Sequence, residues 1–435
     1  MQYYSSKLQS GNVDFRQAVL QCIAPDGGLY IPLDLPRLPQ AVFNNISEMS
    51  LGEVSYFLIN ALLSADLPSA TIKRIVGEAL SFPIPLVKVE EGIYALELFH
   101  GPTHAVKDVS ARMLGRILGA LRPGEDKPIN ALLATNGNSG NAIAHGLYGV
   151  PGVNVVALYP KGLPQKRIAQ LSTLGGNIHP VSVNGTIDQC RKMIGDALRD
   201  EKFSQEMRLT IANSLNIGRV LPNIITYFWA YAQLLQTDQK PDGVWMSVPT
   251  GNGGNLVAGC YARLMGLPVE RLIGACNANG GFDRLLHGQP MLQDTVKTLA
   301  FGMDTPRPCN TPRFEALCGG DMARLRESVG SRSCTDEEIS RAIVDVYERT
   351  GYLLEPHSAT AYISLKESLP EGKTGIFMAT SHPYRSAGLI NSLLGLHLEL
   401  PGAPKAGNGE GRASAMLPPT YPALRKYALT IDDKK

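Results

Sequence analysis

The sequence predicts an α/β protein built on open parallel sheets. From about residue 93 onward, short apolar runs of strand length alternate with longer segments that show helical periodicity. This alternation is typical of βαβ units, in which consecutive strands run parallel. Several apolar runs end directly in glycine- and asparagine-rich loops, and open α/β sheets bind ligands at such strand ends. The chain has 435 residues, which is long enough for two or three domains with a large core.

The residues before this alternation show mainly helical patterns. Helices are expected over 15–23, 52–63 and 69–80, and the turn at 25–28 ends the first of them. Pro83 and Pro85 then interrupt the chain. Because no cluster of chemically active residues occurs here, we expect an extension that packs against the rest of the protein.

The other predicted elements follow in order along the chain. Strands are expected over 93–98, 129–134, 153–159, 178–183, 244–248, 272–276 and 375–379. Helices are expected from residues 107, 141 and 163, and over 187–198, 217–235 and 255–265. Thr335 and Glu338 form a capping box that starts a helix running to about residue 349. Residues 402–415, rich in glycine and alanine, are expected to form a surface loop.

Composition and charge exclude several classes of protein. The 41 basic and 39 acidic residues are dispersed and give a net charge of only +2, so no nucleic-acid partner is expected. The seven cysteines are widely spaced, which argues against a disulfide framework or a zinc knuckle. The N-terminus lacks a signal-peptide pattern, and no apolar run reaches the length of a membrane helix. We therefore expect a cytoplasmic protein with no membrane partner.

Lys107 has the most unusual setting of any residue in the chain. It follows an apolar strand and a tight loop at Gly101-Pro102, and it opens a helix with apolar residues at three- and four-residue steps. It is therefore expected to project into the crevice at the carboxyl end of that strand. The positive end of a helix disfavours an ammonium group, so the pKa of Lys107 should be lowered, as a Schiff-base lysine needs. On the local pattern alone, a surface lysine is the alternative.

The segment Pro249-Thr-Gly-Asn-Gly-Gly-Asn255, here called the glycine loop, lies between a predicted strand and a predicted helix. Its glycines suit a phosphate bound at a helix N-terminus. The third glycine of a dinucleotide fingerprint would fall at Leu256, and no Gly-Lys-Ser/Thr sequence of a Walker loop follows. A single phosphate monoester therefore fits better than a nucleotide, and a bare tight turn is the alternative.

Three further polar segments are candidates for binding an anionic ligand. Residues 135–141 combine two glycines with several side-chain donors, which suits a carboxylate or a phosphate. Residues 379–385 follow an apolar strand and end in Arg385, and residues 213–219 end in Arg219. His100 and His104 have the spacing of a helical zinc pair, but Gly101-Pro102 between them forbids a regular helix. No metal site is expected.

A Schiff-base lysine, a single-phosphate loop and a second anion loop together imply pyridoxal 5'-phosphate (PLP) and an amino-acid substrate. The chain resembles the threonine synthase family of fold-type II PLP enzymes over almost its whole length. The residues that carry the resemblance are Glu97-Leu-Phe-His-Gly-Pro-Thr-x-Ala-x-Lys-Asp108, Ala134-Thr-x-Gly-x-x-Gly140, Thr173-Leu-Gly-Gly-Asn177, Asn213-Ser-x-Asn216 with Arg219, Ser247-Val-Pro-x-Gly-Asn-x-Gly254, Glu355-Pro-His357 and His382-Pro383.

The resemblance implies a role for each matching residue. Lys107 is expected to form the Schiff base and to move protons. Further cofactor contacts are expected from Asn138 at the phenolic oxygen, Thr380 at the pyridine nitrogen, and Gly251, Asn252, Gly253, Gly254 and Asn255 at the phosphate. The substrate carboxylate is expected at Thr135, Asn136, Ser139 and Gly140. The substrate phosphate is expected at Asn213, Ser214 and Arg219, with Arg385 as a helper.

The resemblance also implies an architecture and a reaction. The architecture is similar to that of the tryptophan synthase β subunit, with two open parallel-sheet α/β domains. The expected domains are a helical N-terminal extension (1–85), a large PLP-binding domain (86–125 and 215–401), a smaller mobile domain (126–214) and a surface loop with a C-terminal tail (402–435). The expected reaction is a β,γ-replacement that converts O-phosphohomoserine and water to threonine and phosphate, in a monomer or homodimer.

The chain departs from the family pattern at several positions near the expected site, and four of them bear on the reaction. The family usually has Leu-Ala-Phe before the lysine, whereas this chain has His104-Ala-Val106, so both outer residues are candidates for determining specificity. Asn136 and Arg385 also differ from the usual residues. Two alternatives therefore stay open at this point. One is a related lyase or γ-replacement enzyme of specialised metabolism acting on an activated homoserine, and the other is a non-catalytic binding protein that retains the fold.

Overall fold

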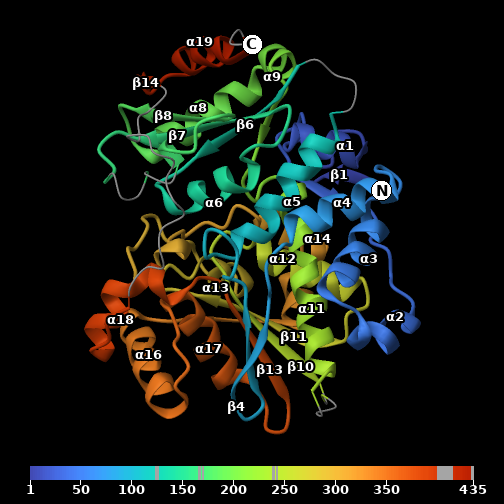
Figure 1. Cartoon of the computed structure of the whole chain (residues 1–435), viewed down its shortest axis with the longest axis vertical. Helices are drawn as coiled ribbons and strands as arrows, with labels where there is room; N and C mark the ends of the chain where they lie inside the picture. The colour runs from blue at the N-terminus through green and yellow to red at the C-terminus, as the bar shows by residue number, and fades with distance from the viewer. Residues whose placement is uncertain are drawn as a thin grey trace.

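The computed structural model describes residues 1–122, 127–164, 168, 171–237, 241, 243–398 and 415–432. In these ranges the strands form three sheets, and the two larger ones, one wholly and one mainly parallel, have helices packed around them (Figure 1). The prediction of an α/β fold with open parallel sheets is confirmed. No described helix combines the length and the apolar character needed to cross a membrane.

The larger sheet contains six strands and carries the loops of the expected cofactor site. Its order is β12-β11-β10-β13-β5-β4, and only the edge pair β4–β5 is antiparallel. The strands are β4 (Leu86–Glu90), β5 (Ile93–Glu97), β10 (Val244–Pro249), β11 (Val269–Cys276), β12 (Val329–Ser333) and β13 (Thr374–Ala379). The parallel register aligns the carboxyl ends of β5, β13 and β10, so the segments that follow these strands begin at one edge.

The second sheet is entirely parallel and has the order β14-β8-β7-β6-β9. Its strands are β6 (Ile129–Ala134), β7 (Val153–Pro160), β8 (Ile178–Val183), β9 (Leu209–Ile211) and β14 (Ala415–Leu417). Helix α8 (Ile187–Arg199) begins with a capping box at Thr186, and it packs on this sheet. In Figure 1 this sheet and its helices form the upper part of the molecule.

The C-terminal segment differs from the tail that the sequence predicts. Strand β14 extends the second sheet, and helix α19 (Tyr421–Asp432) packs against α8. The buried face of α19 consists of Leu424, Ala428 and Ile431, at helical spacing. The expected loop at 402–415 lies outside the described residues apart from its last residue.

The N-terminal segment is also less helical than predicted. It contains an antiparallel sheet with the order β2-β1-β3, formed by β1 (Gln2–Ser5), β2 (Val13–Asp14) and β3 (Tyr30–Pro32). The expected helices are present as α1 (Phe15–Gln21), α3 (Leu51–Leu63) and α4 (Ser69–Ala79), together with the short α2 (Gln40–Asn45) and η1 (Ile46–Glu48). Two- to four-residue strands are too short to leave a recognisable alternation in the sequence.

The long helix predicted over 217–235 is interrupted. The chain forms α10 (Ile217–Val220), a 3-10 turn η2 (Leu221–Asn223) and then α11 (Ile224–Leu235). Pro222 lies in the turn, where its ring and missing N–H disfavour a continuous α-helix. The apolar periodicity continues through the break because both helices bury their apolar residues in the same core.

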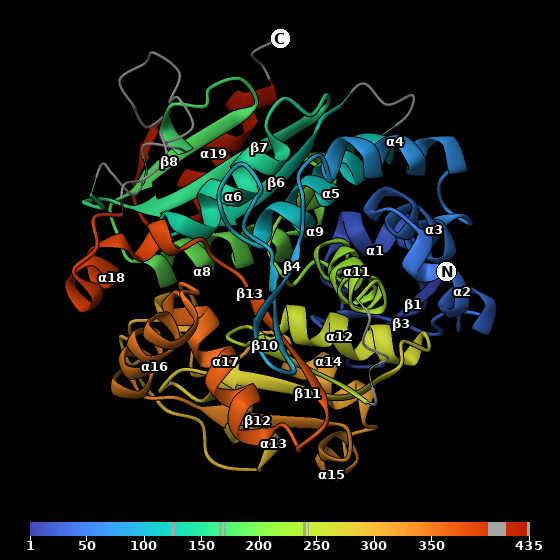
Figure 2. The same ribbon diagram turned by 60° about the horizontal axis from the view of Figure 1, so that its bottom comes forward.

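Helix α5 (Lys107–Ala120) connects the two parallel sheets, and it packs closely on α6 (Asn138–Leu147). A Cβ atom at Gly146 would lie 2.6 Å from the Ala111 Cβ, so only glycine permits this approach. Figure 2 shows α5 and α6 beside the second sheet, above the strands of the larger sheet. The contact brings the loop that follows β6 toward the loops of the larger sheet.

The remaining helices cover the larger sheet or lie on the flanks of the second one. They are α9 (Glu201–Glu206), α12 (Gly254–Leu264), α13 (Gly281–Leu286), η3 (Phe301–Met303), α14 (Thr311–Leu317), α15 (Met322–Arg326), α16 (Asp336–Thr350), α17 (Pro356–Ser368), η4 (Pro383–Ser386) and α18 (Ala387–Leu394). Buried apolar residues from α16 and α17 pack with those of β5, β11 and β13 in one cluster.

The capping box of α16 gives a test of the fold. Thr335 Oγ1 accepts from the Glu338 N–H at 3.2 Å, and the Thr335 N–H donates to Glu338 Oε2 at 2.7 Å. We expect Thr335→Ala to lower the free energy of unfolding by about 1 kcal/mol, because it leaves a helix N–H without a partner. Thr335→Ser should retain most of this stability. Urea denaturation checks the prediction, and equal stability of the alanine variant would contradict it.

Candidate active site

Lys107 lies at the first position of α5, next to the segment that follows β13. The two segments pair through their backbones. The Leu98 N–H donates to the Ala379 carbonyl at 2.9 Å, and the Val106 N–H donates to the Thr380 carbonyl at 2.9 Å. The His382 N–H donates to the His104 carbonyl at 3.1 Å. Thr380 is therefore fixed beside the lysine segment.

The surroundings of Lys107 lower the pKa of its ammonium group to about 8. The main cause is removal of the amine from water, and the positive charges of Arg385 and Arg219 contribute next. The negative charges of Asp108 and Glu355 oppose them. The direction agrees with the sequence prediction, but burial and two arginines, rather than the helix end alone, account for it.

Asp108, the residue after the lysine, holds the preceding loop in place. Its buried carboxylate accepts from the Thr103 N–H at 2.8 Å and from Thr103 Oγ1 at 2.7 Å. Burial raises the pKa of Asp108, and the hydrogen bonds from Thr103 oppose that rise. Arg385 Nη1 donates to the Thr103 carbonyl at 2.9 Å. The same loop is thus held from both sides, and Arg385 is fixed near Lys107.

The glycine loop begins helix α12 without a side-chain cap. Gly253 is the N-cap residue and has φ +79°, a left-handed conformation that glycine adopts most easily. A Cβ atom at Gly253 would lie 2.6 Å from the Phe314 ring. Both side-chain amide atoms of Asn255 are buried without a hydrogen-bond partner among the described residues. Unpartnered donors beside a free helix N-terminus suit a phosphate group.

The loop between β6 and α6 is stabilised by one of the residues predicted to bind ligand. Thr135 Oγ1 accepts from the Gly137 N–H at 2.9 Å and from the Gly140 N–H at 3.0 Å. Its hydroxyl proton stays available as a donor. The Asn136 side chain is exposed, and Gly137, which precedes the helix, provides no side-chain cap. The side chains of Asn138 and Ser139 lie outside the described residues.

Residues 213–216, here called the Asn213 loop, approach the glycine loop. A Cβ atom at Gly254 would lie 3.1 Å from the Ser214 Cβ, so the two loops are in contact. Asn213 Oδ1 accepts from the Leu215 N–H at 2.9 Å, which shapes the Asn213 loop.

Arg219 lies just beyond the Asn213 loop in α10. Its side chain is only 6% exposed, and its Nε and Nη1 have no hydrogen-bond partner in the described part of the chain. Burial lowers the pKa of its guanidinium to about 10, so Arg219 keeps its charge at neutral pH. A buried cation whose donors have no partner among the described residues suits an anionic ligand.

The two specificity candidates lie in different surroundings. The His104 ring meets His382 edge to face, with centroids 5.6 Å apart, and His382 stacks on Tyr384 at 4.0 Å. Burial, followed by the charges of His104 and His100, lowers the pKa of His382 to about 4, so His382 is neutral at physiological pH. Val106 is half-buried against the main core.

Among the described residues, no group of three or more His, Cys, Asp or Glu is arranged to hold a metal.

Two groups of residues near the site received no role from the sequence. Glu355 Oε2 lies 2.6 Å from His357 Nδ1, and the Gly302 N–H donates to His357 Nε2 at 3.0 Å. Because Nε2 accepts, the proton of a neutral His357 is on Nδ1 and faces the carboxylate. The pair fixes the 3-10 turn η3, whose Met303 packs against Gly251. Asn310 and Arg313 are the second group, and no local sequence pattern marks them.

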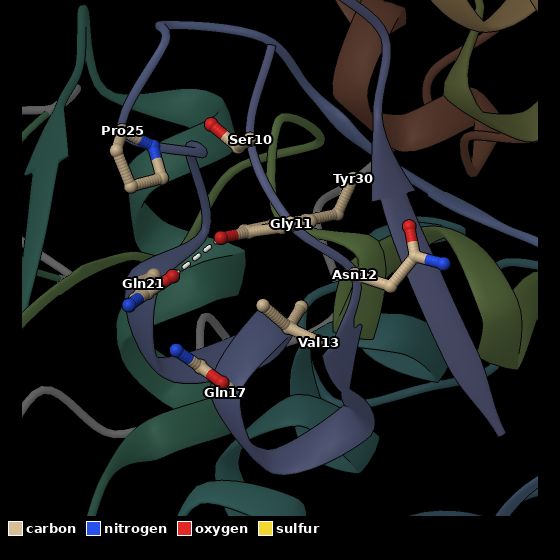
Figure 3. Close-up of a pocket in the computed structure, with 8 residues that line it drawn as sticks. All are labelled: Ser10, Gly11, Asn12, Val13, Gln17, Gln21, Pro25 and Tyr30. Atoms are coloured by element: carbon tan, nitrogen blue, oxygen red, sulfur yellow. Dashed lines mark hydrogen bonds between the residues drawn. The ribbon is translucent and has the colours of Figure 1, made fainter. Parts of the chain in front are cut away.

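A cavity of about 240 Å³ lies in the N-terminal segment (Figure 3). Its lining is formed by Ser10, Gly11, Asn12, Val13, Gln17, Gln21, Pro25 and Tyr30, and the Tyr30 hydroxyl donates to the Gln21 side chain. None of the predicted site residues contributes to it. We therefore place the candidate site at Lys107 and not at this cavity.

Comparisons with known proteins agree with the geometry. Residues 80–381 match the family described as pyridoxal-phosphate dependent enzyme, and residues 2–80 match the family described as threonine synthase N terminus. Threonine synthase of Haemophilus influenzae is 41% identical over 99% of this chain and 100% of its own length. Threonine synthase of Escherichia coli is 37% identical over 99% of both chains.

Solved structures show the same similarity. The crystal structure of threonine synthase from Escherichia coli superposes with a TM-score of 0.88 at 35% identity, covering 99% of this chain and 100% of that one. A PLP-bound threonine synthase from Brucella melitensis superposes with a TM-score of 0.91 at 27% identity over 99% of both chains. The predicted fold type is thereby confirmed.

The lowered pKa of Lys107 can be tested without any ligand. Between about pH 8 and the ordinary lysine pKa of 10.5, Lys107 should be largely neutral while surface lysines are still charged. Only the neutral amine is acetylated, so the rate of Lys107 acetylation, followed by peptide mass spectrometry in cofactor-free protein, should reach half its maximum near pH 8. Arg385→Gln removes a positive neighbour and should move this midpoint upward.

Arg349→Gln is the matched control, because Arg349 pairs with Glu90 away from Lys107. It should leave the midpoint unchanged. A midpoint near 10.5 in the unsubstituted protein would contradict the account of Lys107.

Proposed function

The chain belongs to the threonine synthase family of PLP-dependent enzymes, and we propose that Lys107 is the lysine that binds the cofactor. The observation that carries this proposal is the meeting of three features at one sheet edge. These are a lysine whose pKa is about 8, the uncapped glycine loop, and the Thr380 segment bonded to the lysine segment. A neutral amine is the form that condenses with an aldehyde.

The residues present fit the cofactor. The glycine loop offers the first N–H groups of α12 and the unpartnered amide of Asn255 to a phosphate. We assign Gly251, Asn252, Gly253, Gly254 and Asn255 to the phosphate, Thr380 to the ring nitrogen and Asn138 to the phenolic oxygen. When bound, the cofactor supplies an electron sink for the carbons of the amino-acid substrate.

The substrate is proposed to be O-phosphohomoserine, with water as the second reactant and threonine and phosphate as products. Arg219, with Asn213 and Ser214, binds the substrate phosphate, since Arg219 is buried and has free donors. Thr135, Asn136, Ser139 and Gly140 bind the carboxylate at the start of α6. Arg385 contributes positive charge, although its Nη1 donates to the Thr103 carbonyl.

Lys107 moves the protons of the reaction. In the protein without ligand the pKa of Lys107 is about 8, so its amine is suited to accept and return a proton near neutral pH, and it would do so at the substrate when the cofactor holds the substrate amine. Lys107 would take the protons from Cα and Cβ as phosphate leaves from Cγ, and a proton at Cγ and water at Cβ would complete the β,γ-replacement. The lyase and binding-protein alternatives are not favoured by the full-length similarity to threonine synthases.

The domain division is part of the same proposal. The loop at Thr135 to Gly140, assigned to the carboxylate, follows a strand of the second sheet, and the glycine loop follows a strand of the larger sheet. We propose that movement of the smaller domain, 126–214, closes the substrate site over the cofactor site. We propose the extension at 1–85 and the large domain at 86–125 and 215–401, and we add residues 415–432, which pack on the second sheet, to the smaller domain. We also propose a cytoplasmic monomer or homodimer, and the net charge of +2 gives no indication of a nucleic-acid partner.

Removal of the lysine tests the assignment. Lys107→Ala should lose both turnover and the visible absorption band of lysine-bound cofactor, because no amine remains at this position. Lys88→Ala is the control, since Lys88 pairs with Glu91 on the exposed side of β4. It should retain both properties. A lysine-bound band that persists in Lys107→Ala would show that another residue binds the cofactor.

Identification of the product tests the reaction itself. Incubation of PLP-loaded protein with O-phosphohomoserine should release equal amounts of phosphate and threonine, detected by chromatography. Formation of 2-oxobutyrate with ammonia instead would identify a lyase. In that case His104 and Val106 are the first residues to exchange for the family's Leu and Phe.

A further inference from the structure

Arg313, in helix α14, is buried and has no carboxylate partner among the residues that the structure describes. Its side chain is 0% exposed, and burial lowers the pKa of its guanidinium. Nε donates to the Tyr30 carbonyl at 3.2 Å, Nη1 to the Ser214 carbonyl at 2.9 Å and Nη2 to the Leu215 carbonyl at 2.7 Å. Nη1 also donates to Asn310 Oδ1. All four acceptors are uncharged, so the positive charge of Arg313 is not neutralised locally.

Asn310 joins Arg313 to the glycine loop. Its N–H donates to the Asn252 carbonyl at 3.2 Å, and its Nδ2 donates to the same carbonyl at 2.9 Å. Nδ2 also lies 3.4 Å from Ser214 Oγ. Asn310 therefore holds both loops at once, and its own orientation is fixed by Arg313.

We propose that Arg313 is a positioning residue that sets, through Asn310, the spacing between the glycine loop and the Asn213 loop. The inference rests on the proposed function, in which these loops bind the phosphates of the cofactor and of the substrate. Two phosphates at touching loops repel each other, and the repulsion is strong in a site shielded from water. The charge of Arg313, satisfied only by neutral oxygens, attracts both anions. Its planar fork holds the Ser214 and Leu215 carbonyls at a fixed separation.

Tyr30 extends this arrangement to the N-terminal segment. Its carbonyl, in strand β3, is the third backbone group that Arg313 binds, and it lies 283 residues away in the chain. Strand β3 is thereby attached to the residue that positions the two loops. This gives the N-terminal segment a structural role at the site, although it contains no chemically active residues.

Two variants test separately the bridge made by Asn310 and the planar guanidinium of Arg313. Asn310→Ala removes the bridge between the loops but keeps the guanidinium, and Arg313→Lys keeps the charge but loses the fork. Each should raise both the KM for O-phosphohomoserine and the Kd for inorganic phosphate on PLP-loaded protein by about tenfold or more, because small displacements of binding groups are costly. The Kd for PLP, measured by titration of cofactor-free protein, should rise with them. The change in kcat should be smaller than the change in KM.

Arg271→Gln is the matched control. Arg271 also donates to backbone carbonyls, those of Glu327 and Arg326 at 3.3 Å, but it lies at the other end of β11 from the site. It should leave KM and both Kd values unchanged. A merely structural role for Arg313 predicts the reverse pattern, in which the melting temperature and the active fraction fall while KM and the Kd values stay the same.

Failure of the proposal for Arg313 and failure of the proposed reaction give different results. If both site variants bind phosphate and PLP within twofold of the unsubstituted protein, the proposal is wrong. If the unsubstituted protein does not convert O-phosphohomoserine, the proposed reaction is wrong, and the two binding measurements still decide the role of Arg313. If Arg313→Lys does not fold, Asn310→Ala alone decides it.

Discussion

The site depends on the parallel register of three adjacent strands, β10, β13 and β5. Register pairs such as Ser247 with Phe377 and Ala379 with Glu97 bring the ends of these strands to one edge of the sheet. The glycine loop, the Thr380 segment and the Lys107 segment then begin side by side. Backbone hydrogen bonds between the last two segments complete the arrangement. The position of the lysine is therefore determined by the sheet and not by its own side-chain contacts.

The same arrangement places several positive charges in a restricted space. Arg219 and Arg385 lie close enough to lower the pKa of Lys107, and Arg313 lies behind the glycine loop without a carboxylate partner. Such a concentration of cations is unfavourable in the empty protein, because each charge is partly removed from water. It becomes favourable when two phosphates and a carboxylate are bound. The electrostatics of the site thus point to a substrate and a cofactor that both carry phosphate.

The sequence was sufficient where function follows from local order along the chain. A strand, a glycine-rich turn and a helix are adjacent in sequence, so the positions of the glycine loop and of Lys107 between a strand and a helix could be predicted, while their roles stay proposals. The break at Pro222 and the short strands of the N-terminus were missed, because core packing preserves periodicity through a break and very short strands show none. Arg313 could not be predicted, since its partners are distant in sequence and its role exists only after folding. The hydrogen bonds from the Gly137 and Gly140 N–H groups to Thr135 could not be predicted either, because they form only in the folded loop.

The central claim is that Lys107 is covalently linked to the cofactor in the resting protein. Reduction of PLP-loaded protein with borohydride, followed by proteolysis and mass spectrometry, tests this most directly. The account predicts a pyridoxyl-phosphate adduct on the peptide that contains Lys107, with other lysines unmodified. An adduct on a different lysine, or a fully reduced sample without any adduct, would contradict it.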